Sequence, residues 1–204
     1  CFFDWGKKDD FPAALEAHAT GIIAGGAEMD TLGGDHYISY PLLKAHAKKH
    51  GPLSLIHFDA HRDVEPDDGG RIDHGTMFGY AVREGLIDPK KSVQIGIRTV
   101  FTGERTYGFR IVYADEVHES TSAQVADIVK KVVGKNKAYL TFDIDSLDPA
   151  AAPGTGTPIP GGLTYHQAAA IIRKRTDINF IAMDVVEVSP PYDHAEITSL
   201  AAAS

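Results

Sequence analysis

The stretch that most limits how this chain can fold is Leu53–Asp63, which reads LSLIHFDAHRD. It begins as a continuous apolar run, the pattern of a strand buried on both faces of a parallel sheet. It then breaks into Asp59, His61 and Asp63 at alternate positions. In an extended chain alternate side chains share one face, about 6.5–7 Å apart. We therefore expect the three side chains to converge on one small anionic volume beyond the strand end.

Such a group of acids needs compensation. A buried carboxylate without a partner costs several kcal/mol, unless a cation or hydrogen bonds offset its charge. A bound metal is the simplest source of that positive charge. The alternative is a strand that runs out into solvent and ends in a polar edge.

The overall charge narrows the classes of partner. The chain of 204 residues has 20 Lys and Arg against 28 Asp and Glu, a formal charge of −8. This balance argues against nucleic acid or an anionic membrane and suits a small cationic substrate. The single cysteine, Cys1, excludes an internal disulfide and fits a reducing compartment such as the cytoplasm. No apolar run reaches the roughly 18–20 residues that span a bilayer.

Both ends suggest a longer native chain. The sequence opens at Cys1 rather than Met, and it closes on Leu200–Ser204, which has the composition of a starting helix. We expect residues 1–204 to form a single domain that lacks N-terminal and C-terminal parts.

Helical and strand patterns alternate along the chain. The expected helices are Phe11–Ala24, Tyr40–His50, Met77–Glu84, Ser122–Val133 and Tyr165–Lys174. The expected strands are Ala27–Leu32, Leu53–Phe58, Ser92–Ile97, Arg110–Tyr113, Ala138–Phe142 and Asn179–Val188, the last with Glu187 at its end. This alternation predicts an α/β fold, with a mostly parallel central sheet, helices on both faces, and functional loops at the carboxyl ends of the strands.

A second strand, Ala138–Phe142, also breaks into acids. Together with the tight turn Gly33–His36, the strand ends supply six candidate ligands: His36, Asp59, His61, Asp63, Asp143 and Asp145. Four carboxylates balance two divalent cations, and two such cations about 3.5–4 Å apart can ionise a shared water. Asp59 and Asp143, the first acid after each strand, are the natural bridges. Oxygen and imidazole ligands without a thiolate favour manganese over a structural zinc, with zinc, iron, cobalt and nickel left open.

Several spaced motifs resemble one known family. They are GGDH (33–36), HFDAHRD (57–63), DHGTMF (73–78), QIGIRT (94–99), TFDIDSLDPAAAPGTGTPIPGGLT (141–164) and MDVVEVSPPYD (183–193). Together they resemble the ureohydrolases, the arginase and agmatinase family, and within it the agmatinases most. The resemblance implies a three-layer αβα domain of the arginase/deacetylase-like type, a site for two Mn²⁺ ions per chain, and a homotrimer or homohexamer.

The resemblance also implies roles for particular residues. One metal would take His36, Asp59, Asp63 and Asp143, and the other Asp59, His61, Asp143 and Asp145. His74 would be the general acid that protonates the leaving amine, and Glu187 would pair with the substrate guanidinium, close to Thr157. Asp73 and Asp184 would orient other site residues. Each of these three residues has an alternative interpretation. His74 could be an exposed surface histidine, Glu187 a surface acid, and Thr157 a structural threonine in a turn.

The implied reaction hydrolyses a guanidino group to urea and an amine. Agmatine, cleaved to putrescine and urea in polyamine biosynthesis, is the first choice. Phe101 and Glu65 replace an acid and a small amide of the arginases, and an acidic or aromatic lining suits a second cation. An ω-guanidino acid such as guanidinobutyrate is the second choice, favoured if Arg62 or Arg71 faces the pocket.

Two rival interpretations stay open on the sequence alone. Deacetylase-like amidohydrolases use the same sheet with one zinc and fewer ligands, and the full second ligand set argues against them. A metal-binding homologue without catalytic activity is the other.

Overall fold

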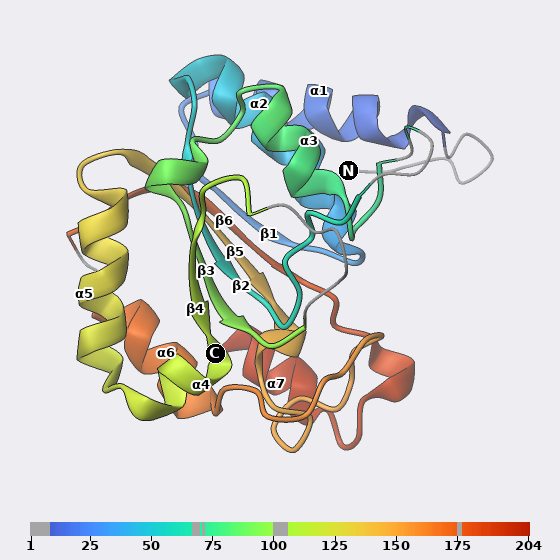
Figure 1. Cartoon of the computed structure of the whole chain (residues 1–204). Helices are drawn as coiled ribbons and strands as arrows, with labels where there is room; N and C mark the ends of the chain where they lie inside the picture. Colours follow the sequence, from blue (N-terminus) through green and yellow to red (C-terminus); the bar gives the residue numbers. More distant parts are fainter. Residues whose placement is uncertain (1–8, 67–69, 71, 100–105, 175–176) are drawn as a thin grey trace.

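The computed structural model describes residues 9–66, 70, 72–99, 106–174 and 177–204. They contain one six-stranded sheet in the order β1-β6-β5-β2-β3-β4, in which every neighbouring pair is parallel (Figure 1). The strands are β1 (Met29–Leu32), β2 (Ser54–Phe58), β3 (Val93–Ile97), β4 (Arg110–Tyr113), β5 (Lys137–Asp143) and β6 (Asn179–Val186). The predicted parallel sheet is confirmed.

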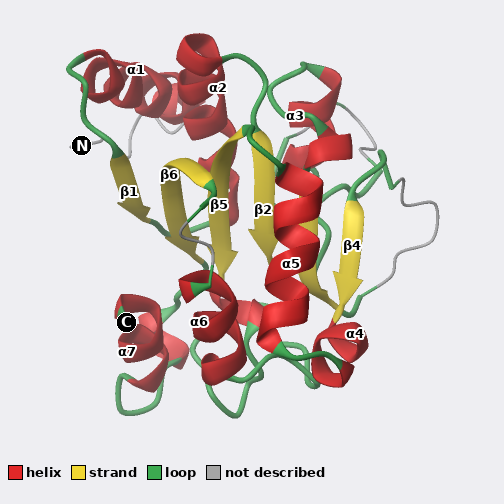
Figure 2. Cartoon of the chain, turned by 90° about the vertical axis from the view of Figure 1, so that its left-hand side faces the viewer, coloured by secondary structure: helices red, strands yellow, loops and turns green. Residues whose placement is uncertain are grey.

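Helices cover both faces of this sheet (Figure 2). On one face lie α1 (Phe11–Ala24), α2 (Ser39–His50) and α3 (Met77–Arg83), and on the other α4 (Ala114–Glu119), α5 (Ser122–Val133) and α6 (Tyr165–Arg173). A last helix, α7 (Ile197–Ala203), and four short 3₁₀ turns complete the described elements: η2 (His36–Ile38), η3 (Pro89–Lys91), η4 (Ile144–Ser146) and η5 (Pro190–Tyr192). None of the described helices has the length and apolarity to cross a bilayer.

Successive strand residues pack alternately into the two hydrophobic cores, one on each face of the sheet. On β2, Leu55 packs into the core beneath α1, α2 and α3, while Ile56 and Phe58 pack into the core beneath α4, α5 and α6. All five residues of β2 are buried, as the sequence of an inner parallel strand requires. This is why the strand reads as a continuous apolar run rather than as an alternating one.

The central strands end at the same level. β2 and β5 are hydrogen-bonded neighbours, in register from Ser54 opposite Ala138 to Phe58 opposite Phe142. The next residue on each strand is an acid, so Asp59 and Asp143 lie side by side at the carboxyl edge of the sheet. The register of two buried strands therefore sets the position of the site.

The element bounds differ from the predictions in two instructive places. β6 ends at Val186, not Val188, because Glu187 has a left-handed backbone (φ 64°) that ends the extended conformation. Helix α4 was not predicted, because its six residues bury only Ala114 and Val117, too few for a helical period to show. By contrast, α5 has its predicted bounds and a capping box between Thr121 and Gln124.

Candidate metal centre

The structure brings the six candidate ligands together at the carboxyl edge of the sheet. Asp143 ends β5 and Asp145 lies in η4, while Asp59, His61 and Asp63 come from the segment after β2, and His36 opens η2. All are buried except His61, which is partly exposed. Segments far apart in the sequence thus meet in one volume, as predicted.

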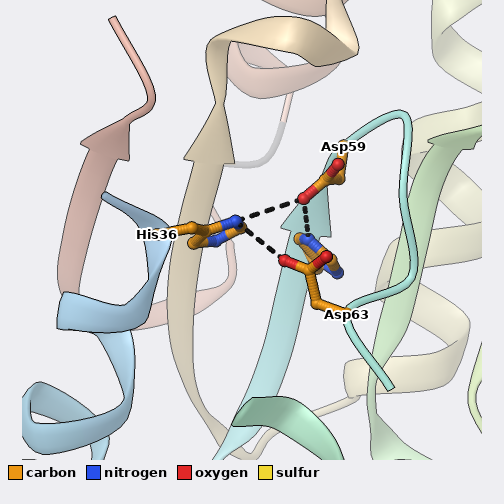
Figure 3. Close-up of side chains that lie close together, drawn as sticks. His36, Asp59 and Asp63 are labelled. Atoms are coloured by element: carbon orange, nitrogen blue, oxygen red, sulfur yellow. Dashed lines mark hydrogen bonds and ion pairs between the residues drawn. The ribbon is translucent and has the colours of Figure 1, made fainter. Parts of the chain in front are cut away.

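His36 faces three carboxylates, two of which, those of Asp59 and Asp63, are drawn with it in Figure 3. Its Nδ1 atom lies 3.2 Å from Asp59 Oδ2, 3.0 Å from Asp63 Oδ2 and 3.1 Å from Asp143 Oδ2. The Nδ1 atom nevertheless forms no hydrogen bond with a described residue. A buried nitrogen that faces three acid oxygens in this way fits a cation placed between them.

The hydrogen bonds on the opposite side of the His36 ring indicate that Nδ1 carries no proton and has a free lone pair. Nε2 lies 2.8 Å from the Thr141 hydroxyl, which is 3.5 Å from the Ser39 hydroxyl. Ser39 in turn donates to Asp184 Oδ2 at 2.7 Å. We assign the ring proton to Nε2. Nε2–H then donates to the Thr141 hydroxyl, which donates to the Ser39 hydroxyl, which donates to Asp184. That tautomer leaves Nδ1 free to bind a metal.

A second group of ligand atoms surrounds His61. Its Nδ1 atom lies 3.0 Å from Asp145 Oδ2 and 3.3 Å from Asp59 Oδ1. Asp59 therefore directs Oδ2 toward His36 and Oδ1 toward His61, the placement of a bridging carboxylate. Asp143 Oδ1 instead accepts the backbone N–H of Asp145 at 2.8 Å. The contacts show Asp59 between the two groups more directly than Asp143.

The expected reason for this convergence was wrong. The segment from Asp59 to Asp63 is not an extended strand, because Asp63 has a left-handed φ of 53°. The segment turns back instead, and the Ala60 N–H donates to Asp145 Oδ1 at 3.0 Å. Gly96 of β3 permits the turn, since a Cβ there would lie 3.1 Å from the Asp59 carbonyl oxygen.

The crowded acids change one another's pKa. Burial raises the pKa of Asp143 well above its usual range, and the charges of Asp145 and Asp59 raise it further. Burial and the charge of Asp59 also raise the pKa of Asp63 to about 6. Burial opposes a charge on His61, but Asp145 and Asp59 outweigh it and raise its pKa to about 11. The site therefore favours added positive charge.

A pocket opens directly above this cluster. Its lining residues are His36, His61, Asp63, Glu65, Asp73, His74, Gly75, Asp143, Thr157 and Glu187. Five of them are acids, and the described lining contains no lysine or arginine. Arg62 is 5% exposed and is not one of these lining residues. Arg71, whose role the sequence left open, and Phe101, which the sequence suggested as part of the lining, lie outside the described residues.

His74 and Glu187 lie at the rim of this pocket. His74 is half-exposed, and its Nδ1 atom lies 2.9 Å from Asp35 Oδ2. The hydrogen bond that His74 donates to Asp35 raises the pKa of His74 to about 9. Glu187 Oε1 accepts the backbone N–H of His36 at 2.6 Å, so one of its oxygens already has a partner. Asp35 was not anticipated from the sequence, because an acid in a glycine turn is common without any such role.

The remaining predicted residues lie around the cluster. Thr157 donates its hydroxyl to Asp145 Oδ2 at 3.1 Å. Asp184 is buried beneath His36, and it also accepts the Tyr139 hydroxyl at 2.6 Å. Asp73 Oδ1 accepts the Thr76 hydroxyl at 3.1 Å, at the start of α3. Asp184 thus reaches His36 through two hydroxyls, whereas this contact of Asp73 is with the start of a helix.

Known proteins share both sequence and structure with this chain. The sequence pattern of the Arginase family matches residues 2–204. An agmatinase from Chromobacterium violaceum is 55% identical over 206 residues, which covers all of this chain and 63% of that protein. The crystal structure of a hypothetical agmatinase from Burkholderia thailandensis has a TM-score of 0.96 and 53% identity, covering all of this chain and 64% of that one.

A more distant structure shares the same fold. The proclavaminate amidino hydrolase from Streptomyces clavuligerus has a TM-score of 0.87 and 42% identity, covering 94% of this chain and 66% of that one. The chain spans somewhat less than two thirds of the length of the curated relatives it matches, 63% for the Chromobacterium violaceum protein and 65% for an agmatinase from Photorhabdus laumondii.

Proposed function

The chain belongs to the arginase family, and we propose that it hydrolyses a guanidino group to urea and an amine, with agmatine as the substrate and putrescine as the amine product. The observation that carries this proposal is the buried Nδ1 atom of His36, which faces three carboxylate oxygens and forms no hydrogen bond with a described residue. The acidic pocket above it supports a cationic substrate.

The residues fit a pair of divalent cations. One would be held by His36, Asp59, Asp63 and Asp143, and the other by Asp59, His61, Asp143 and Asp145. When bound, such a pair lowers the pKa of a coordinated water and so makes a nucleophile available at neutral pH. We propose manganese, because the donors are oxygens and imidazoles without a thiolate. The second group of donors around His61 disfavours a single-zinc deacetylase-like site.

We propose His74 as the general acid. The nitrogen that leaves the guanidinium carbon must gain a proton to depart as an amine. With a pKa of about 9, His74 holds that proton at neutral pH. Its ring lines the same pocket as Asp63 and Glu187, and Asp35 holds Nδ1. Nε2 is therefore the atom available to a substrate.

Glu187 and Thr157 would position the guanidinium. The Glu187 carboxylate lines the pocket and can accept guanidinium N–H groups. Because Oε1 already accepts the His36 N–H, that pairing would use Oε2 and the second lone pair of Oε1. Thr157, bonded to Asp145, would lie against the same group. These roles would place the guanidinium carbon above the metal ligands.

The tail of the substrate is the finer part of the proposal. Glu65 and Asp73 add two more acids to the described pocket lining, which suits a second cation such as the ammonium of agmatine. An ω-guanidino acid such as guanidinobutyrate stays the second candidate. The 42% identical relative named for proclavaminate shows that proteins similar to this one include amidino hydrolases with other names.

Two further predictions concern the oligomeric state of the protein and its location in the cell. A homotrimer or homohexamer and a cytoplasmic location stay predictions. Light scattering of the purified protein checks the first, and fractionation of cells checks the second.

Urea release tests the proposed activity. Manganese-loaded protein is incubated in turn with agmatine, guanidinobutyrate and arginine, and urea is measured over time. We expect agmatine to give the highest rate. If agmatine is the poorest of the three, the substrate assignment is wrong. If none releases urea, the chain is a metal-binding homologue without this activity.

A further inference from the structure

A histidine outside the expected ligand set lies beneath the metal centre. His57 is the fourth of the five residues of β2 and is 0% exposed. Its ring packs on Phe78, with ring centroids 4.7 Å apart, and lies 5.3 Å from the His36 ring. Both nitrogens of this buried imidazole have polar partners within 3.0 Å, and those partners determine its tautomer.

Those partners indicate one tautomer. The Gln94 side-chain amide nitrogen lies 2.7 Å from the Arg62 carbonyl oxygen, which can only accept, so that atom is a donor. The same nitrogen lies 3.0 Å from His57 Nδ1. Nδ1 must then be the acceptor, and the ring proton is on Nε2. Nε2 lies 2.7 Å from Asp59 Oδ2, to which it donates.

We propose that His57 is a positioning residue of the metal centre, which holds the bridging carboxylate of Asp59 in place from beneath. The proposal rests on the metal site of the proposed function, but not on its substrate. His57 is not a ligand here, because its Nε2 proton lies between the ring and Asp59.

The two oxygens of Asp59 are held in matching ways. Oδ1 faces His61 and accepts the backbone N–H of that residue at 2.6 Å. Oδ2 faces His36 and accepts the His57 N–H. The first hydrogen bond comes from the backbone and is kept by any substitution except proline, whereas the second depends on one side chain. Loss of His57 should therefore loosen Oδ2, and with it the cation on the His36 side, more than the cation beside His61.

The alternative is that His57 only fills the core. It predicts that His57 variants change the stability of the fold and leave the affinity for metals unchanged. A hydrogen-bonding role predicts instead that the affinity for metal ions depends on whether residue 57 offers a hydrogen-bond donor at the position of Nε2.

Metal titration distinguishes the hydrogen-bonding role of His57 from the core-filling role. Manganese is titrated into metal-free protein by calorimetry, for the unsubstituted protein, His57→Leu and His57→Gln, whose amide nitrogen can replace Nε2–H. Loss of an outer hydrogen bond to a metal ligand typically weakens binding about 10–100-fold. We expect His57→Leu to weaken one of two ions by about that factor, and His57→Gln to restore it to within about 3-fold. Equal binding by all three proteins would overturn the proposal.

One further variant serves as a control, and another is a second test of the same hydrogen bonds. Ile56→Val trims the neighbouring β2 residue, which faces the opposite core, and should lower the unfolding midpoint without changing metal affinity. Gln94→Leu removes the donor to Nδ1 and should weaken the same ion as His57→Leu, which keeps the test decisive if His57→Leu does not fold. In the metal-free protein, ¹⁵N NMR should show the His57 proton on Nε2, and a proton on Nδ1 would contradict the assignment.

The outcome is independent of the substrate test. If the unsubstituted protein binds two ions and His57→Leu weakens one, the proposal holds even when no guanidine is hydrolysed. If agmatine is hydrolysed and His57→Leu binds both ions normally, the proposed function holds and the role of His57 is wrong.

Discussion

The hydroxyl of Thr141 offers a sharp test of how His36 is oriented. Thr141 is a fully buried residue of β5, and its Oγ1 atom lies 2.8 Å from His36 Nε2. Thr141→Val keeps the shape of the side chain but removes the hydroxyl, so it leaves no cavity. The His36 N–H then has no acceptor at this position, and the relay through Ser39 to Asp184 is broken.

The expected magnitude follows from that geometry. A buried N–H group left without its partner costs about 1–3 kcal/mol of the free energy of unfolding. Because the Nε2 hydrogen bond also fixes the tautomer that exposes Nδ1, we expect a loss of about 10–100-fold in affinity for one metal ion. Thr141→Ser is the matched control. It removes a buried methyl group, at a cost of about 1 kcal/mol, but keeps the hydroxyl.

Chemical denaturation of metal-free protein and calorimetric titration with manganese measure the two effects. We expect valine to lower both the stability and the affinity, and serine to lower the stability alone. If valine leaves the affinity for both ions unchanged, Thr141 does not orient His36, and the lone-pair assignment for Nδ1 loses its support.

Other substitutions test separate parts of the site. Asp143→Ala should abolish binding of both metal ions together with activity, because this acid is assigned to both, and two ions per chain measured by elemental analysis of the variant would refute the bridging role. His74→Ala should keep both ions and lose urea release, and an unchanged rate would remove His74 from the mechanism. The pKa of His74 is raised to about 9, so its proton is held below that pH and lost above it, and the rate should fall as pH rises through about 9. In Asp35→Asn this alkaline limb should move toward pH 6.5, and a limb that stays in place in the pH–rate profile would contradict the pairing. Arg98→Lys should lower the unfolding free energy by about 1–3 kcal/mol in thermal melts, since lysine cannot reproduce the guanidinium bonds to the Asp145 and Ile159 carbonyls, at 2.6 Å and 2.7 Å, and an unchanged midpoint would refute that role.

Much of the scaffold follows from local chemistry in the sequence. The continuous apolar character of Leu53–Phe58 predicts an inner parallel strand, and β2 is buried on both faces. Helix α5 is marked by an amphipathic period, a Thr121 cap and a Gly134 stop, all of which act within a few residues. Such elements are readable because the residues that mark them lie within a few positions of one another in the sequence.

The details of the site are less readable because they depend on backbone turns and on contacts between distant strands. The gathering of acids at the strand ends was predicted correctly, but through an extended chain rather than through the left-handed Asp63. Likewise, the left-handed Glu187 ends β6 earlier than its apolar pattern suggests. Nothing local distinguishes a polar residue that supports a ligand from one that is merely tolerated in a strand.

His57 shows the same limit. Within the HFDAHRD motif it reads as one more strand residue, because its partner Gln94 comes from the next strand of the sheet. Only the register of β2 against β3 brings the two side chains together. A polar residue in a fully buried strand is the one signal in the sequence that could have singled it out.

The number of metal ions that each chain binds tests the proposed metal centre most directly. Metal-free protein is titrated with manganese, the bound ions per chain are counted by elemental analysis, and the electron paramagnetic resonance spectrum of the loaded protein is recorded. We expect two ions per chain with the spectrum of a spin-coupled pair, since Asp59 directs one oxygen toward each group of ligands. A single ion per chain, or two ions without magnetic coupling, would contradict it.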